Sequence, residues 1–337
     1  MSDPARDTLS AKAGYLIEMA ARALSVHNTQ PWRFEIDRDA IELYADPSRQ
    51  LLVDPGGREM VISCGAALYG LRLAVRSLGY LPDVELLSDS ATQELAPRAL
   101  ARLRLGPAAP VTAEERKLLA AVPHRHTHRG PFESGPLPKG LLPRLEDDVR
   151  AEHATLIVID SPRARRELAE LVTATACQQD RDPRSRSDIW QWTRSTGSLA
   201  RDGVPAHAIP AVPERAAGQL PQRDFDLGRN VGWLATDGPA APVTAALFTS
   251  GDGPQEWLQA GQALHRLLLH AASRWVFARL NTQPLEDAAT RALVKECLIG
   301  PGSLQLLLQL GVSRTAHVTG RRPLADLIDP DRAPDGA

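Results

Sequence analysis

Residues 25–34 read SVHNTQPWRF and join two regular elements of different periodicity. Before this segment, apolar residues between positions 9 and 24 recur at the three- and four-residue spacing of a helix. After it, apolar and polar residues alternate as they do in a strand. Pro31 stops the helix, because proline fixes φ and lacks a backbone donor. Taken alone, the segment indicates a loop between a helix and a strand, anchored by Trp32.

The composition is that of an ordinary soluble globular protein. The chain has 337 residues, of which 43% are hydrophobic, and a formal net charge of −2, which argues against a general nucleic-acid binder. Cys64, Cys177 and Cys297 lie far apart without metal-ligand spacing, so we expect reduced thiols in a cytoplasmic protein. We find no signal-peptide pattern and no apolar run that approaches a membrane span, so we expect no membrane partner.

Periodicity and capping signals predict a chain of alternating helices and strands. Helices are expected at residues 8–24, 58–78, 113–122, 138–149, 161–178 and 254–280. Strands are expected at residues 32–37, 41–44, 99–105, 155–159, 243–249 and 304–310. Residues 180–230 show no sustained period but contain Trp190 and Trp192, so we interpret them as an ordered covering segment or lid. These tryptophans either cover a substrate pocket or pin a loop to the core.

Two of the predicted helices resemble each other in sequence. Residues 64–73 (CGAALYGLRL) align with residues 260–269 (AGQALHRLLL), with identical residues at five positions. Each helix is followed by a strand, and each half also begins with a helix and a strand, which favours an internal duplication. We therefore predict an α+β fold of two duplicated halves, residues 1–110 and 111–330, packed like a homodimer about a pseudo-two-fold axis, with a tail at 331–337.

The polar motifs are divided unequally between these halves. The loop at residues 25–34 has no counterpart at residues 150–154, which occupy the same place in the second half. Conversely, only the second half is preceded by the cluster at residues 124–129 (HRHTHR), and only it ends in Arg321-Arg322. Any site built from all three features therefore draws on both halves of the chain.

The pattern SxxNxQPWRF after an N-terminal helix resembles the FMN-binding nitroreductase superfamily. The layout is similar to its internally duplicated Acg-like branch, with further support from residues 54–59 (DPGGRE), 62–68 (ISCGAAL), 280–286 (LNTQPLE) and 321–324 (RRPL). In that family the loop motif faces the flavin of the partner subunit. An Arg-x-Ser/Thr-x-Arg signature and basic residues near the C-terminus hold the FMN phosphate.

The resemblance assigns candidate roles to residues of this chain. Arg125, Thr127 and Arg129 alternate along an extended segment, so they point the same way and can clamp the FMN phosphate. Arg321 and Arg322 can supply a second fork. Asn28 and Gln30 can hydrogen-bond polar edges of the flavin or fix the loop itself. The resemblance places these residues beside the isoalloxazine: Leu24, Ser25, Val26, Thr282 and Gln283. Because each cluster occurs in one half only, we expect one FMN per chain.

Other interpretations of these residues remain. His124, His126 and His128 share one face of an extended segment, but two arginines interleave and no carboxylate or cysteine lies at ligand spacing, so we assign no metal site. We name no catalytic side chain, because in flavin chemistry the cofactor carries the electrons.

We expect an FMN-dependent oxidoreductase that uses NAD(P)H to reduce an unidentified nitroaromatic or quinone-like acceptor. The alternatives are an FMN sequestration or storage protein with a lid-covered flavin and a specialised dehydrogenase. We expect a monomer that acts as a pseudo-dimer.

Overall fold

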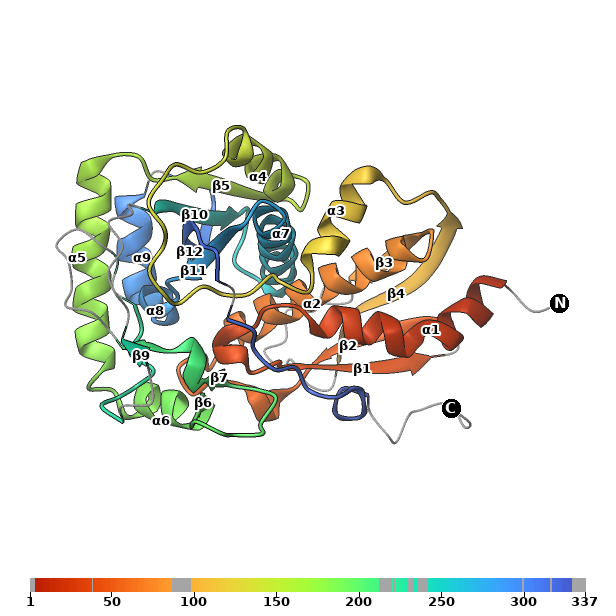
Figure 1. Ribbon diagram of the computed structural model, residues 1–337, viewed down its shortest axis with the longest axis horizontal. Coiled ribbons are helices and arrows are strands. Elements are labelled where there is room, and N and C mark those ends of the chain that lie inside the picture. Colours follow the sequence, from red (N-terminus) through yellow and green to blue (C-terminus); the bar gives the residue numbers. More distant parts are fainter. Residues whose placement is uncertain are drawn as a thin grey trace.

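Two four-stranded antiparallel sheets have the same strand order (Figure 1). The computed structural model describes residues 4–37, 39–86, 98–211, 220, 222–229, 233–234, 242–298, 300–315 and 317–328. The first sheet, in the order β1-β2-β4-β3, consists of β1 (Trp32–Asp37), β2 (Ala40–Ala45), β3 (Tyr80–Leu86) and β4 (Ala99–Ala108). The second, in the order β5-β10-β12-β11, consists of β5 (Ala154–Val158), β10 (Val243–Thr249), β11 (Val276–Leu280) and β12 (Ser303–Val312).

Helices pack between and around the sheets. They are α1 (Pro4–Ala21), α2 (Arg58–Ser77), α3 (Ala113–Ala121), α4 (Leu141–Arg150), α5 (Pro162–Gln179), α6 (Pro183–Trp192), α7 (Pro254–Ala272), α8 (Gln283–Glu286) and α9 (Ala288–Cys297). Each half of the chain follows the order helix, two strands, long helix, two strands, when α5 and α6 between β5 and β10, and α8 and α9 between β11 and β12, are set aside. The helices α1 and α2 occupy the same places in the first half as α4 and α7 in the second. The α+β prediction is confirmed, and the matching topology is consistent with the predicted duplication.

The crossing of α2 and α7 places corresponding residues in reciprocal contact. A Cβ atom added to Gly65 would lie 2.3 Å from the carbonyl oxygen of Leu258. A Cβ atom added to Gly261 would lie 1.9 Å from the carbonyl oxygen of Ile62. Both pairs are related by the offset of the sequence repeat, so the contact has the self-complementary form of a two-fold interface.

The hydrophobic core is shared between the halves. One cluster of buried residues includes Phe34 and Leu68 from the first half together with Leu264 and Leu308 from the second. The division of the chain at residue 110 therefore remains a prediction. The predicted tail at 331–337 lies outside the described residues.

The predicted helix at residues 254–280 is wrong at its C-terminal end. The helix α7 ends at Ala272, and β11 begins at Val276 after Trp275 adopts a φ of 57°. Apolar residues stand on both sides of Ser273 and Arg274, so the apolar character of the stretch concealed the reversal of the chain. The elements that were not predicted include β3, α6, α8, α9, β11 and the short strands of the segment between β5 and β10. The strand β3 carries Pro82 and alternating exposed residues, which suit the edge position that it occupies in its sheet.

Two further segments position the site. An insertion between β5 and β10 holds α5, α6 and two short parallel ribbons, β6 (Thr193–Arg194) with β7 (Val204–Pro205) and β8 (Pro210–Ala211) with β9 (Trp233–Leu234). After β12, a C-terminal strap at residues 313–328 runs from the second half to the first (Figure 1). It ends at the edge of the first sheet, where the amide of Phe34 donates to the carbonyl of Leu327 at 2.8 Å. Within the described residues, no helix has the length and apolar character needed to cross a membrane.

Candidate functional site

The loop after α1 has an unusual backbone. His27, Asn28 and Gln30 adopt positive φ values of 47°, 56° and 51°, a region that residues other than glycine seldom enter. Such a conformation persists only when surrounding contacts impose it. Ser25 supplies one of these contacts, because its hydroxyl accepts a hydrogen bond of 2.9 Å from the amide of Gln30. Ser63 of α2 supplies another by accepting from the amide of Val26 at 3.3 Å.

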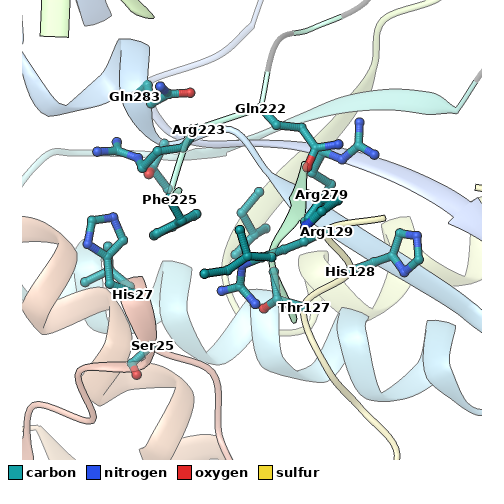
Figure 2. A pocket seen from close by; sticks show the side chains of 15 residues that line it. Ser25, His27, Thr127, His128, Arg129, Gln222, Arg223, Phe225, Arg279 and Gln283 are labelled. Atoms are coloured by element: carbon teal, nitrogen blue, oxygen red, sulfur yellow. The ribbon is translucent and has the colours of Figure 1, made fainter. Parts of the chain in front are cut away.

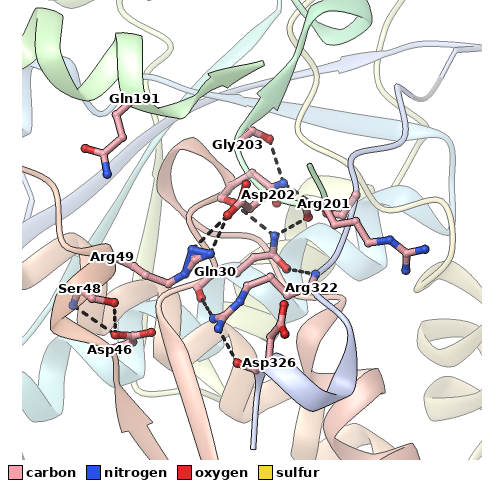
Figure 3. A network of polar contacts seen from close by, with 12 residues as sticks. Gln30, Asp46, Ser48, Arg49, Gln191, Arg201, Asp202, Gly203, Arg322 and Asp326 are labelled. Atoms are coloured by element: carbon pink, nitrogen blue, oxygen red, sulfur yellow. Dashed lines mark hydrogen bonds and ion pairs between the residues drawn. The ribbon is translucent and has the colours of Figure 1, made fainter. Parts of the chain in front are cut away.

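Gln30 and Arg322 brace this loop against two distant segments (Figure 3). The Gln30 side chain donates to the carbonyl of Arg201 in the insertion at 2.9 Å and accepts from the amide of Arg322 at 2.8 Å. The Arg322 guanidinium in turn donates to the Gln30 carbonyl at 3.1 Å and to the carbonyl of Asp326. Neither residue lines either of the two cavities described below, so the structure places both in the support of the loop.

Asn28 connects the loop to the other arginine of the pair. Its side-chain oxygen accepts from Arg321 at 3.1 Å, and its side-chain nitrogen donates to the carbonyls of Gly203 and Gly320 at 3.0 and 3.3 Å. The amide is thereby fixed in orientation, with its oxygen toward the guanidinium. Asn28 lines the smaller cavity and also holds Arg321 at its edge.

Three of the four arginines predicted from the sequence meet in a small cavity, namely Arg125, Arg129 and Arg321, whereas Arg322 does not line it. The segment at residues 127–128 lies beside β11, where the amide of His128 donates to the carbonyl of Ala278 at 2.8 Å. Alternate residues of this extended segment point the same way, so Arg125, Thr127 and Arg129 face one space, as their spacing predicted. The residues that line this cavity are Leu24, Ser25, Asn28, Arg125, Thr127, Arg129, Thr319 and Arg321.

The three arginines of this cavity carry unbalanced charge. Among the described residues, none of Arg125, Arg129 and Arg321 forms an ion pair with a carboxylate. Buried nitrogens of all three lack a hydrogen-bond partner in the described structure. Burial lowers the pKa of Arg125 and of Arg129 to about 10, and burial together with neighbouring arginines lowers that of Arg321 well below its usual value. An anion bound here would satisfy the orphaned donors and restore the charge balance.

A larger cavity adjoins the first and shares Ser25, Thr127 and Arg129 with it (Figure 2). It encloses about 760 Å³, part of which is open to solvent. Its walls come from both halves and from the insertion: Ser25, Val26, His27, Thr127, His128, Arg129, Ile209, Pro210, Gln222, Arg223, Phe225, Arg279, Leu280, Thr282 and Gln283. The predicted residues Val26, Thr282 and Gln283 are therefore brought together with the cationic cluster.

Several lining residues were not predicted. His27 lies inside the recognised motif but at a position to which the motif assigns no role. Arg223 and Phe225 belong to the aperiodic insertion, and Arg279 lies where the sequence was misread as helix. Arg279 donates to the carbonyl of Gly130 at 2.7 Å and, among the described residues, faces no carboxylate. Only tertiary structure brings these side chains to the cavity, so spacing along the chain gave no signal.

The insertion is tied to the cavity wall by a buried ion pair. Arg223 pairs with Glu286 of α8, and their side chains are only 7% and 2% exposed. Gln179 of α5 also donates to Glu286, at 2.8 Å. Burial raises the pKa of Glu286, while the guanidinium opposes that shift. The contact fixes the insertion over α8, although parts of the expected lid at 180–230, including residues 212–219, lie outside the described residues.

Trp190 and Trp192 of the insertion do not line either cavity. Trp192 is buried against Leu51 and Val53, and it stacks under the guanidinium of Arg49 at 5.3 Å. Trp190 is 65% exposed. Trp192 therefore pins the insertion to the loop that precedes α2.

The three histidines of residues 124–129 do not converge on one point. His124 stacks on Trp275, whereas His126 and His128 bond through Nε2 to the carbonyls of Pro123 and Pro131. Within the ranges that the structure describes, no three His, Cys, Asp or Glu side chains are grouped to hold a metal ion.

Comparison with known proteins gives relatives along nearly the whole chain. No family model matches the sequence. The protein named "Putative NAD(P)H nitroreductase Rv3131" from Mycobacterium tuberculosis is 32% identical over 301 residues, which cover 88% of this chain and 83% of that protein. "Putative NAD(P)H nitroreductase acg" from the same organism is 27% identical over 93% of each chain. A crystal structure of a nitroreductase with bound FMN from Desulfitobacterium hafniense aligns with 63% of this chain and 97% of that chain, at 15% identity and a TM-score of 0.39. The identity to the first relative, over most of both chains, shows that this chain belongs to the nitroreductase family.

Proposed function

We propose that the chain is an FMN-dependent oxidoreductase that uses NAD(P)H to reduce a nitroaromatic or quinone-like acceptor. The observation that carries this proposal is the group of buried arginines, without counter-charge among the described residues, beside a larger cavity. A phosphate dianion is the kind of group that such a cluster accommodates. The relatives named as NAD(P)H nitroreductases support the same activity.

The residues present fit FMN. Arg125, Thr127, Arg129 and Arg321 would hold its phosphate, since they line the small cavity and leave buried donors unsatisfied. The flavin ring would lie along Ser25, Val26, Thr282 and Gln283, which line the larger cavity, whereas Leu24 lines only the small cavity and would lie nearer the phosphate. Asn28 would position Arg321, while Gln30 and Arg322 would brace the loop.

Bound FMN would supply two-electron hydride chemistry. The chain would supply binding, orientation and exclusion of water. Val26, Leu280 and the insertion residues Ile209, Pro210 and Phe225 give the larger cavity apolar walls, against which planar rings can stack. The backbone around residues 25–27 and 282–283 would present hydrogen-bonding groups to the ring edge.

We further propose one FMN per chain and a monomer that acts as a pseudo-dimer. The place equivalent to the flavin loop, residues 150–154, carries the buried Glu152. Its carboxylate pairs with Arg72 at 2.5 Å and with Arg266 at 3.0 Å. These cations are already balanced, unlike the arginines of the proposed phosphate site. Among the described residues of this junction, a second flavin would therefore find these two cations already paired.

The alternative is an FMN sequestration or storage protein. It is favoured by the insertion, which lines the cavity through Gln222, Arg223 and Phe225 and is tied down by the Arg223–Glu286 pair. A closed insertion would protect the flavin and limit its reaction with other molecules.

Flavin loading and reduction test these proposals. The purified protein is expected to be yellow, with about one FMN per chain and the mass of a monomer by light scattering. In anaerobic stopped-flow mixing, NADPH or NADH is expected to bleach the flavin rapidly, and a quinone to restore its colour. Flavin that only dithionite reduces would support sequestration instead. A colourless protein that takes up no FMN would contradict both functions.

A further inference from the structure

His27 is a buried polar residue without a partner. Its side chain is only 5% exposed, and neither ring nitrogen has a hydrogen-bond partner among the described residues. The ring lines the larger cavity and meets Phe225 edge to face, with centroids 5.2 Å apart. Burial, reinforced by Arg223 and Arg129, lowers the His27 pKa well below its usual value, so the imidazole is neutral at physiological pH. A neutral imidazole has one N–H donor and one acceptor nitrogen.

Arg223 offers a second free donor in the same part of the cavity. Its Nη2 atom is engaged by Glu286, but its Nη1 atom is buried and has no partner in the described structure. Figure 2 shows His27, Arg223 and Phe225 on one side of the cavity, with Arg129, Arg279 and His128 on the other. Neither His27 nor Arg223 lines the small cavity, so both lie apart from the proposed phosphate site.

These unsatisfied donors indicate that the ligand presents an oxygen to them. Buried donors without partners are rare, because each costs the free energy of its lost hydration. The His27 N–H and the Arg223 Nη1–H are donors, so the group that satisfies both is a hydrogen-bond acceptor. The aromatic face of Phe225 beside them suits a flat ring that carries this oxygen.

Resting on the proposed function, we propose that His27 and Arg223 recognise the electron acceptor by binding one of its oxygens. The acceptor class is then a planar aromatic compound with a carbonyl or nitro oxygen at the ring edge. His27 would act as a specificity-determining residue, contributed by the first half, whereas Arg223 would be contributed by the insertion. Acceptor binding would thereby join parts of the chain that lie almost 200 residues apart.

The test is calorimetric titration of the oxidised, FMN-loaded protein with 1,4-naphthoquinone, without a reductant. The variant His27→Phe keeps a ring against Phe225 and removes both hydrogen-bonding nitrogens, so about tenfold weaker quinone binding is expected. His27→Asn keeps a donor and tolerates positive φ, so its affinity is expected within about threefold of the original. Naphthalene, which lacks the oxygens, is expected to bind equally weakly to all three proteins.

His153 provides the matched control. It also has a positive φ, 59°, but it is exposed in the equivalent turn of the second half and lines neither cavity. His153→Phe therefore imposes a similar backbone demand, and its quinone affinity is expected to be unchanged. Unchanged quinone affinity in His27→Phe would overturn the inference. An equal loss of FMN affinity in that variant would also overturn it, because His27 would then serve the flavin.

The titration, taken together with the anaerobic mixing of the flavin-loaded protein with NAD(P)H, separates this inference from the proposed function. Quinone binding that depends on His27, in a protein whose flavin NAD(P)H does not reduce, would support the acceptor site and contradict the NAD(P)H-driven activity. Rapid reduction by NAD(P)H with quinone binding insensitive to His27 would support the activity and remove His27 from acceptor recognition.

Discussion

Replacing Arg129 with alanine is expected to weaken FMN binding roughly 10- to 100-fold, which corresponds to one charge-assisted contact. Arg129 lines both cavities and lies between the proposed phosphate site and the proposed ring site. Its buried Nη1 atom has no partner among the described residues, so the phosphate would satisfy a donor that the protein leaves free. The loss is therefore expected to concern the phosphate and not the flavin ring.

Riboflavin, which lacks the phosphate, provides the matched ligand. The ratio of FMN to riboflavin affinity, measured by fluorescence quenching with apoprotein, is expected to fall in Arg129→Ala. It is expected to stay constant in Arg322→Ala, because Arg322 braces the loop through Gln30 and any loosening would affect both ligands alike. Arg102→Ala is a further control, since Arg102 pairs with Asp37 on the first sheet. An unchanged ratio in Arg129→Ala would remove Arg129 from the phosphate site.

The sequence predicted the repeated framework because that framework depends on local periodicity. The sequences of α2 and α7 align with five identical residues, one of which is the glycine pair Gly65 and Gly261, and this alignment indicated a repeat before any contact was known. The reversal at Trp275 was missed because only Ser273 and Arg274 separate the apolar end of α7 from the apolar residues at 275–278. The edge strand β3 was missed because its proline and exposed residues weaken the strand signal.

The candidate site was predictable where one short segment carries it. Arg125, Thr127 and Arg129 face one cavity because alternation along an extended chain is a local property. Arg321 and Arg322 could not be distinguished by sequence, since only the strap and Gln30 decide which guanidinium reaches the cavity. The position of Arg223 likewise depends on how the insertion folds back over the cavity, which cannot be predicted from the spacing of residues.

The stability of the protein should be sensitive to a single methyl group added at the crossing of α2 and α7. Gly261→Ala is expected to lower the free energy of unfolding by about 2 kcal/mol or more, because overpacking a helix crossing displaces backbone. The added Cβ atom would lie 1.9 Å from the carbonyl oxygen of Ile62 and 2.7 Å from the amide nitrogen of Ala66. No side chain can move aside to relieve these contacts, and the better helix propensity of alanine offsets only about 1 kcal/mol of the cost.

Urea unfolding followed by circular dichroism measures this effect, with Gly14→Ala as the control. Gly14 also lies in a helix, α1, but the nearest contact of an added Cβ atom is the flexible side-chain tip of Leu324, at 3.0 Å, so a change near zero is expected. Gly65→Ala should behave like Gly261→Ala, because its Cβ atom would meet the carbonyl of Leu258 in the reciprocal contact. Since this crossing holds the loop at residues 25–34 of the first half against the arginines of the second, both variants should also bind FMN and riboflavin more weakly, in equal proportion, if the proposed flavin site is correct. An unchanged free energy of unfolding in both Gly261→Ala and Gly65→Ala would show that α2 and α7 can move apart without cost. That result would contradict a close-packed pseudo-two-fold interface.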